Sequence, residues 1–277
     1  MVVYPPAKIN LGLYVVERRP DGYHNLETVF YAIPHHDIME VEELRYSNMP
    51  YEFETNGIEI EGKADDNLVV KVYKHLQEEF QLPPVHISLN KKIPTGAGLG
   101  GGSSDAAYMM KALNSIFTLG LSESKMEEKM AMFGADCPFF IRHQPTFATG
   151  IGNIFAPIKL HLDGCFLVLV KPSISVSTKD AYSQICPKNP QYPLIETLEK
   201  EPIETWRNKI YNDFEKGVFL IHPEIALIKK NLYDLGALYA SMSGSGSSVY
   251  ALFDDMPPEN EKLQELFNNS FIYQTRL

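Results

Sequence analysis

One stretch of the sequence decides what fold the chain can adopt: Pro94-Thr95-Gly96-Ala97-Gly98-Leu99-Gly100-Gly101-Gly102-Ser103-Ser104-Asp105. Five of the seven residues from 96 to 102 are glycine, and that density costs too much backbone entropy for a helix or a central strand. Apolar residues then recur at helical spacing: Ala106, Met110, Leu113 and Phe117. The stretch predicts a glycine loop and, from Ser103 or Ser104 onward, an amphipathic helix that packs on a core.

A glycine loop at the start of a helix predicts an anion-binding site. Backbone N–H groups at a helix N-terminus favour negative charge, and glycine removes the side chains that would keep a phosphate away. Ser103 and Ser104 could cap the helix and also reach a phosphate or its magnesium ion. The competing interpretation is a flexible glycine-serine linker, which we disfavour because such linkers do not usually end at a helix start.

The same glycines match a second nucleotide motif. The pattern Gly96-x-Gly98-x-x-Gly101 spells the dinucleotide fingerprint, which needs a strand that runs straight into the first glycine and an acidic residue about 20 positions later. Here Lys91-Lys92-Ile93-Pro94-Thr95 intervenes, and the patterns that follow predict helix after helix. We therefore do not expect a Rossmann site.

An upstream segment, Gly57-x-x-x-x-Gly62-Lys63, approaches the P-loop motif of nucleotide triphosphatases. Ala64 stands where that motif has the Ser or Thr that holds magnesium, and Asp65 and Asp66 would repel a phosphate. We interpret the segment as a turn between strands. The signatures of protein kinases are absent from the sequence.

Strand-like and helix-like patterns alternate along the 277 residues, which is typical of a mixed α and β fold in two domains. The patterns predict strands over 9–16, 39–44, 85–89, 166–170 and 249–253, and helices over 68–80 and 123–133. Pro223 and Pro258 suit a first helical position and predict later helices there. We expect one domain over 1–155 and a second over 156–277.

The composition excludes several classes of partner. The net charge is -10, whereas proteins that bind nucleic acid need a basic face. The longest apolar run, Cys165 to Val170, is far shorter than the roughly 20 residues that span a bilayer, and no signal peptide is recognisable. Three cysteines without regular spacing fit a reducing cytoplasm. We expect no nucleic acid, no membrane, and a monomer or weak homodimer in the cytoplasm.

Three segments together resemble the motifs of the GHMP kinases, the superfamily of galactokinase, homoserine kinase and mevalonate kinase. Pro6-Ala7-Lys8-Ile9-Asn10-Leu11 resembles the first motif, the glycine loop the second, and Ser241-Met242-Ser243-Gly244-Ser245-Gly246-Ser247-Ser248-Val249-Tyr250 the third. The resemblance implies an α+β, two-domain GHMP kinase fold. Its N-terminal nucleotide-binding domain is like domain 2 of ribosomal protein S5, and its C-terminal α/β domain is ferredoxin-like.

Two more segments resemble one branch of these kinases: Arg18-Arg19-Pro20-Asp21-Gly22-Tyr23-His24-Asn25-Leu26 and Gly134-Ala135-Asp136-Cys137-Pro138-Phe139-Phe140. This implies that ATP phosphorylates the 2-hydroxyl of a methylerythritol carrying a cytidine diphosphate, in the non-mevalonate route to isoprenoid precursors. Mg²⁺ would arrive with ATP, with Ser104 as the candidate protein ligand. Two alternatives remain open, a sibling kinase of the mevalonate or homoserine type and a non-catalytic nucleotide-binding protein. From Cys186 to Ile221 the resemblance assigns nothing.

The resemblance assigns the catalytic roles to Lys8 and Asp136. A hydroxyl is a poor nucleophile, and a carboxylate can accept its proton as the new bond forms. A lysine can keep that carboxylate ionised and can stabilise negative charge on the phosphoryl group. Without the motifs, the two residues would be interpreted as a solvated strand end and a turn residue after Gly134.

The resemblance also assigns the binding residues. ATP binding falls to Asn67, which could instead only cap a helix, and to Pro94, Thr95, Gly96, Ala97, Gly98, Leu99, Gly100, Gly101, Gly102, Ser103 and Ser104. Tyr23 and His24 resemble a cytidine-recognising pair, in which an aromatic face stacks on the base and a histidine bonds its edge. Tyr182 aligns with an aromatic residue that sandwiches the base, and Asn10 shares a strand face with Lys8 and could touch substrate. Without the motifs, Tyr23 and His24 would be a turn and a packed tyrosine.

Two other patterns could indicate a binding site. His35-His36-Asp37 invites a metal interpretation, which we reject because neighbouring residues on a strand point to opposite faces. The loop around Gly244 and Gly246 is either a strand-entry loop or a segment that lies against the phosphates or the substrate diphosphate. The sequence leaves both interpretations open.

Overall fold

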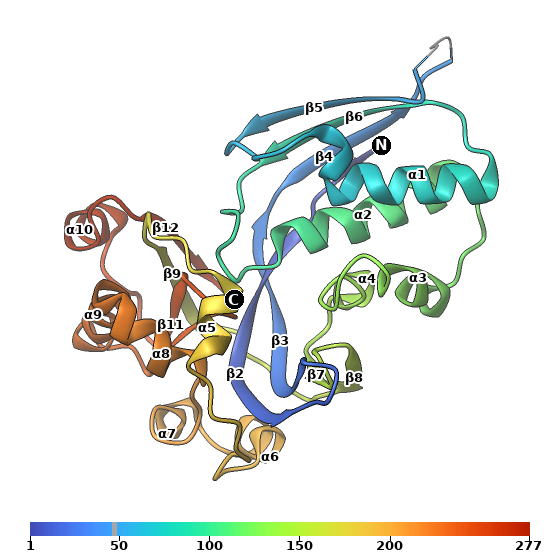
Figure 1. Ribbon diagram of the computed structural model, residues 1–277. Helices are drawn as coiled ribbons and strands as arrows, with labels where there is room; N and C mark the ends of the chain where they lie inside the picture. The colour runs from blue at the N-terminus through green and yellow to red at the C-terminus, as the bar shows by residue number, and fades with distance from the viewer. Residues whose placement is uncertain (46–48) are drawn as a thin grey trace. The chain divides into compact units, whose positions relative to one another are not determined.

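The computed structural model describes residues 1–45 and 49–277 and divides them into two compact units of interleaved segments (Figure 1). Unit 1 comprises Met1–Ala7, His35–Thr95 and Gly100–His143, and unit 2 comprises Lys8–Pro34, Gly96–Leu99 and Gln144–Leu277. We expected one domain over 1–155 and a second over 156–277, which divides the chain at a single position. That division stays a prediction. In the described part of the chain, no helix has both the length and the apolar character to cross a membrane.

Unit 1 is built on a four-stranded sheet of order β1-β4-β6-β5. Its strands are β1 (Val2–Val3), β4 (Ile38–Glu43), β5 (Tyr51–Gly57) and β6 (Val85–Lys91). Its helices are the short η1 (Ala64–Asp66) and α1 (Leu68–Phe80), α2 (Gly101–Ile116), α3 (Glu123–Met130) and α4 (Phe139–Arg142). Every second residue of β6 is buried, and α1 packs along α2 on that side of the sheet (Figure 1). Strand β6 pairs antiparallel with β4 but parallel with β5.

Unit 2 carries two four-stranded sheets, β2-β3-β7-β8 and β10-β11-β9-β12. The first contains β2 (Pro6–Arg18), β3 (His24–His36), β7 (Thr146–Thr149) and β8 (Ile154–Pro157). The second contains β9 (Phe166–Lys171), β10 (Tyr239–Met242), β11 (Val249–Phe253) and β12 (Phe271–Arg276). The first two residues of β2 belong to unit 1, and so do the last two residues of β3.

The helices of unit 2 are α5 (Thr178–Ser183), α6 (Leu194–Lys200), α7 (Ile203–Trp206), α8 (Phe214–Ile221), α9 (Pro223–Asp234) and α10 (Asn260–Leu266). Three of them, α7, α9 and α10, pack against the second sheet. Helix α9 packs against β10 and β11, and α10 packs against β12. Strand β11 is buried at every residue and lies between β10 and β9, so it forms the centre of this core. The predicted mixed α+β class is confirmed.

The helix after the glycine loop differs from its prediction at one end. Helix α2 begins at Gly101, two residues before Ser103, and is capped by Gly100 without a side-chain hydrogen bond. Gly100 can take the cap position because its φ of 69° lies in the left-handed region, which costs glycine little. Ser103 and Ser104 therefore lie in the first turn and do not cap the helix.

Candidate active site

The first turn of α2 presents the donors that a phosphate needs. The first N–H groups of an α-helix have no partner within the helix, and the helix dipole makes that end positive. Gly96, Gly98 and Gly100 all have positive φ, at 60°, 75° and 69°, which residues with side chains rarely adopt. Glycine is therefore required by the path of the backbone as well as by the space that a phosphate would occupy.

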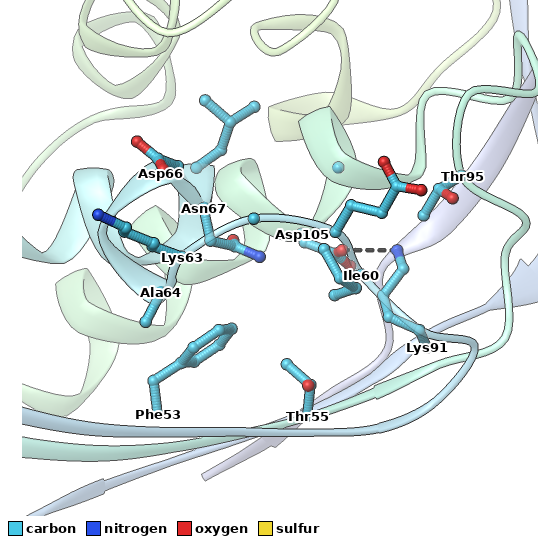
Figure 2. Close-up of a pocket in the computed structure, with 14 residues that line it drawn as sticks. Phe53, Thr55, Ile60, Lys63, Ala64, Asp66, Asn67, Lys91, Thr95 and Asp105 are labelled. Carbon is cyan, nitrogen blue, oxygen red and sulfur yellow. Dashed lines mark hydrogen bonds and ion pairs between the residues drawn. The ribbon is translucent and has the colours of Figure 1, made fainter.

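A cavity of about 380 Å³ lies in unit 1 beside this turn (Figure 2). Its wall includes Thr95 and Gly102 of the glycine segment, and Asn67. The Asn67 side-chain oxygen accepts a hydrogen bond from the Val69 N–H at 2.9 Å, so this residue caps α1 and lines the cavity at once. The two predicted roles of Asn67 are compatible, because the cap uses only one end of the amide.

Other residues of the cavity wall were not expected from the sequence. The wall includes Phe53 and Thr55 of β5 and the segment from Ile60 to Ala64 (Figure 2). The interpretation of Gly57 to Lys63 as a turn between strands is wrong, because β5 ends at Gly57 and η1 and α1 follow. A signal was present in the alternation of Phe53 and Thr55, which places both on one face of an edge strand.

The floor of this cavity holds a buried charge network. Lys91, at the end of β6, contacts the carboxylates of Asp37 and Asp105, the latter at 2.7 Å. The other Asp37 oxygen accepts the backbone N–H groups of Lys92 at 2.6 Å and Ile93 at 2.9 Å. Asp37 thus ties the entry of the glycine loop to β4, a role that the rejected metal interpretation of His35-His36-Asp37 did not foresee.

Burial sets the protonation of this network. Desolvation raises the pKa of Asp105 to about 8, although the ammonium of Lys91 opposes the shift and the nearby Asp37 carboxylate adds to it. Burial alone would lower the pKa of Lys91, but the carboxylates of Asp105 and Asp37 outweigh it, and the pKa of Lys91 is raised. One ammonium and two carboxylates therefore hold one additional proton near neutral pH.

The predicted catalytic lysine lies in unit 2, on β2. Lys8 is 3% exposed, and its ammonium donates to the Asn10 side-chain oxygen at 2.6 Å. The same ammonium lies 5.1 Å from the centre of the Phe30 ring on β3, within the range of a cation-π contact. Asn10, predicted to touch substrate, is 2% exposed and holds Lys8.

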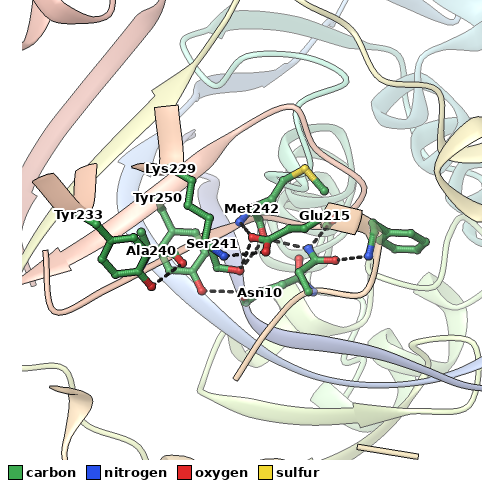
Figure 3. A network of polar contacts seen from close by, with 11 residues as sticks. Asn10, Glu215, Lys229, Tyr233, Ala240, Ser241, Met242 and Tyr250 are labelled. Carbon is green, nitrogen blue, oxygen red and sulfur yellow. Dashed lines mark hydrogen bonds and ion pairs between the residues drawn. The ribbon is translucent and has the colours of Figure 1, made fainter. Parts of the chain in front are cut away.

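The third motif packs against the second within unit 2. Ser243 donates its hydroxyl to the carbonyl of Gly98 at 2.9 Å, and a side chain at Gly98 would overlap the Ser243 carbonyl. The Tyr250 hydroxyl donates to the backbone oxygen of Asn10 at 2.7 Å (Figure 3). The loop at Gly244 is therefore more than a strand entry, because it supports the backbone of both Gly98 and Asn10.

Residues from the stretch that the sequence left unassigned hold this third motif. Glu215 accepts the N–H of Met242 at 2.9 Å and the ammonium of Lys229 at 2.6 Å (Figure 3). Asn212 donates to the carbonyls of Met242 at 2.9 Å and Gly244 at 2.8 Å. The available signal was a polar Asn-Asp pair directly before an apolar helical run.

The residues predicted to bind cytidine lie together in unit 2. The rings of His24 and Tyr182 are stacked, with centres 4.9 Å apart and planes inclined by 21°. Phe214 meets the Tyr182 ring edge-on at 4.7 Å. Tyr23 is 62% exposed. Burial and the charge of Arg18 lower the pKa of His24, so a neutral imidazole with one donor and one acceptor prevails at pH 7.

Asp136 lies in unit 1, in the turn between α3 and α4, and is half-buried. Its neighbour Cys137 is buried, and burial raises the pKa of that thiol to about 11, so it stays protonated and unreactive. Among the described residues, no group of three His, Cys, Asp or Glu side chains could hold a metal ion. Ser104 is fully buried, and its hydroxyl has no hydrogen-bond partner among those residues.

Comparisons with known proteins agree with this architecture. The GHMP kinases N terminal domain matches residues 67–144, and the GHMP kinases C terminal domain matches residues 194–269. A 4-diphosphocytidyl-2-C-methyl-D-erythritol kinase of Bacteroides fragilis is 54% identical over 277 residues and covers 100% of both chains.

Solved structures give the same result. The crystal structure of a 4-(cytidine 5'-diphospho)-2C-methyl-D-erythritol kinase superposes with a TM-score of 0.81 at 29% identity, over 99% of this chain and 98% of the other. A homoserine kinase from Cytophaga hutchinsonii shares the fold, with a TM-score of 0.66 at 17% identity over 98% and 94% of the two chains. The chain therefore belongs to the GHMP kinases and, within them, to the family of 4-diphosphocytidyl-2-C-methyl-D-erythritol kinases, and it is an ATP-dependent small-molecule kinase.

Proposed function

We propose that this kinase transfers the γ-phosphoryl group of ATP to the 2-hydroxyl of 4-diphosphocytidyl-2-C-methyl-D-erythritol, a step of the non-mevalonate route to isoprenoid precursors. The observation that carries the choice of acceptor is the stacked pair of His24 and Tyr182 next to the exposed ring of Tyr23, the residue before His24 in the chain. A phosphate cradle serves any GHMP kinase, whereas a small acceptor such as mevalonate or homoserine has no ring for these side chains to bind. The identity to kinases of this name over the full chain supports the same acceptor.

The ring geometry decides how the cytosine would be bound. A base between two rings needs a separation of about 7 Å, twice the ordinary contact distance. His24 and Tyr182 are 4.9 Å apart, and Phe214 closes on Tyr182, so the base does not enter between this pair. We propose that the base stacks on the exposed ring of Tyr23, and that the neutral imidazole of His24 bonds its polar edge. Tyr182 then acts by holding the His24 ring.

We propose that ATP occupies the cavity of unit 1, with its phosphates at the first turn of α2. Asn67, in the wall of this cavity, would bind the nucleobase, and Thr95 and Gly102, also in its wall, would lie near the phosphates. Mg²⁺ would neutralise phosphate charge. A hydroxyl oxygen is a ligand type that Mg²⁺ accepts, and the unpartnered hydroxyl of Ser104 fits that requirement.

The chemistry then needs a proton acceptor and a positive charge. We propose that Asp136 accepts the proton of the 2-hydroxyl as that oxygen attacks the γ-phosphorus. Lys8 would stabilise the negative charge on the transferring oxygens. Because Asn10 fixes the lysine through a neutral oxygen, this contact adds no negative charge beside the transferring group.

The test is ADP release by the purified chain with ATP, Mg²⁺ and one acceptor at a time. Turnover of the cytidyl substrate, with none of mevalonate or homoserine, is the expected result. No ADP above background with the cytidyl substrate would overturn the proposal, and turnover of one of the small alcohols would replace it. ADP from none of them would favour a non-catalytic nucleotide-binding protein.

A matched pair of tyrosine variants tests the base-binding role. Tyr23→Ala should raise KM for the cytidyl substrate about 10-fold, the scale of one lost base-aromatic stack, and leave KM for ATP unchanged. Tyr4→Ala removes a similarly exposed ring, 57% against 62%, and should change neither constant. If Tyr23→Ala affects only ATP, the two pockets have been assigned the wrong way round.

A further inference from the structure

Four groups in unit 2 form one chain of hydrogen bonds that ends on the proposed catalytic lysine. The Lys8 ammonium donates to the side-chain oxygen of Asn10 at 2.6 Å. The Asn10 side-chain nitrogen donates to the Thr28 hydroxyl at 2.9 Å, and that hydroxyl donates to the Gly12 carbonyl at 2.5 Å. All the side chains are buried, and Thr28 is 1% exposed.

The two ends of this chain fix the direction of every bond in it. An ammonium can only donate and a carbonyl oxygen can only accept. The Asn10 oxygen must therefore face Lys8, which turns its nitrogen toward Thr28, and Thr28 must accept with its lone pair and give its own proton to Gly12. No member can reverse its role while its neighbours keep theirs, so the side-chain amide has one allowed orientation.

The backbone of Asn10 is held independently of its side chain. Its N–H lies 3.3 Å from the Ser243 hydroxyl, and its carbonyl accepts the Tyr250 hydroxyl at 2.7 Å (Figure 3). With both backbone groups fixed, the remaining freedom of Asn10 is rotation of its side chain. The Thr28 hydroxyl holds the side-chain nitrogen, while Lys8 and the Ser243 hydroxyl, at 3.5 Å, contact the side-chain oxygen.

The carbonyl that ends the chain is itself placed by a backbone constraint. Gly12 has a φ of 69°, and a side chain there would meet Leu194 at 2.7 Å and Ile210 at 2.9 Å. Only glycine takes this conformation cheaply in so tight a space. The acceptor for Thr28 is thus a fixed feature of β2.

We propose that Thr28 is a positioning residue of the phosphoryl transfer, which orients the Lys8 ammonium through Asn10 without touching either substrate. The inference rests on the proposed catalytic role of Lys8. A displacement of that ammonium by about 1 Å would weaken charge stabilisation in the transition state while leaving the binding of ATP and acceptor unchanged. The effect therefore belongs in kcat and not in KM.

The experiment compares Thr28→Val with Thr28→Ser in the full chain. Valine keeps the shape but removes the acceptor for Asn10, so kcat should fall about 10-fold with both KM values within about twofold. Serine keeps the hydroxyl and should restore kcat to within about threefold of the wild type. Thr197→Val is the matched control, because Thr197 is 2% exposed and donates its hydroxyl to the Pro193 carbonyl at 2.9 Å in α6. It should lower Tm like Thr28→Val and keep wild-type kcat.

Three outcomes would overturn the inference: a wild-type kcat in Thr28→Val, a Thr28→Ser variant as slow as Thr28→Val, or a change confined to KM. Failure of the proposed function looks different, because the wild-type chain would then release no ADP with the cytidyl substrate. In that case the same comparison is made with whichever acceptor of the panel the wild type does phosphorylate.

Discussion

Two buried lysines show how differently the same ammonium group can be held. Lys91 is 2% exposed and contacts the carboxylates of Asp37 and Asp105, whereas Lys8 is 3% exposed and donates to the amide oxygen of Asn10. Carboxylate partners neutralise the positive charge of the ammonium that they bind. Because they are buried as well, they depend on that positive charge in turn. An amide oxygen fixes the ammonium without contributing an opposite charge. We expect a structural role for Lys91, and Lys8 keeps the chemical role proposed for it above.

The largest expected effect comes from replacing each lysine with methionine. Lys91→Met leaves the buried acids Asp37 and Asp105, which hold one proton between them near neutral pH, without their cation and should lower the free energy of unfolding by about 3–5 kcal/mol. Lys8→Met removes the donor of the Asn10 amide oxygen, and the loss of that hydrogen bond should cost about 1–2 kcal/mol. Urea unfolding followed by circular dichroism measures both.

The control for this pair is Lys74→Met. Lys74 is partly exposed and forms a surface ion pair with Asp65 at 2.8 Å, so its loss should stay below about 1 kcal/mol. Equal losses for Lys91→Met and Lys8→Met would contradict the division into a structural and a chemical lysine.

The second effect concerns turnover. Asp136→Asn should lower kcat at least about 100-fold and leave the Kd for ATP nearly unchanged, because a lost acid-base group acts only in the transition state. Lys8→Met should lower kcat by a similar factor, since it removes the charge that stabilises the transferring oxygens. ADP release gives kcat, and calorimetric titration with ATP gives Kd. Wild-type turnover in Asp136→Asn would refute its role as the base.

Much of the fold could be predicted because its signals are local. Helix α1 runs from Leu68 to Phe80 as predicted, since its apolar spacing and the Asn67 cap point to the same boundaries. Helix α9 begins at Pro223 as predicted, whereas α10 begins at Asn260, two residues after Pro258. The parallel pairing of β5 with β6 carried no local signal, because it depends on contacts between segments far apart in the chain.

Glycine and aromatic residues give parts of the candidate site a signal in the sequence, whereas a buried charge gives none. The sequence analysis assigned no role to Lys91, because its burial between two carboxylates depends on residues 54 and 14 positions away. Glu215 is similar, because its partners Lys229 and Met242 belong to other elements. Single charged residues give no sequence signal of burial, since most of them lie on the surface.

A smaller effect should follow from placing a carboxylate oxygen where Asn10 presents an amide oxygen to Lys8. Asn10→Asp adds a negative charge beside the ammonium and removes the side-chain nitrogen that donates to Thr28, and the two changes together should lower kcat about 10-fold. Asn153→Asp makes the same change in net charge at an exposed turn and should leave kcat unaltered. An unchanged or higher kcat in Asn10→Asp would show that the charge of Lys8 is not used.

The smallest effect comes from the reverse change, in which one carboxylate around Lys91 becomes neutral. Burial raises the pKa of Asp105 to about 8, above its value in an unfolded chain, so between about pH 4 and 8 the folded state keeps a proton that the unfolded state has lost. Folding stability contributed by this group is then present at low pH and is lost as the pH rises toward 8. Asp105→Asn cannot lose that proton. The difference between the free energies of unfolding of Asp105→Asn and the wild type should therefore increase, in favour of the variant, by about 1 kcal/mol or more from pH 6 to pH 8. Urea titrations at each pH measure it. A difference that does not change with pH would mean that Asp105 is ionised throughout, and that Lys91 is held by two full negative charges.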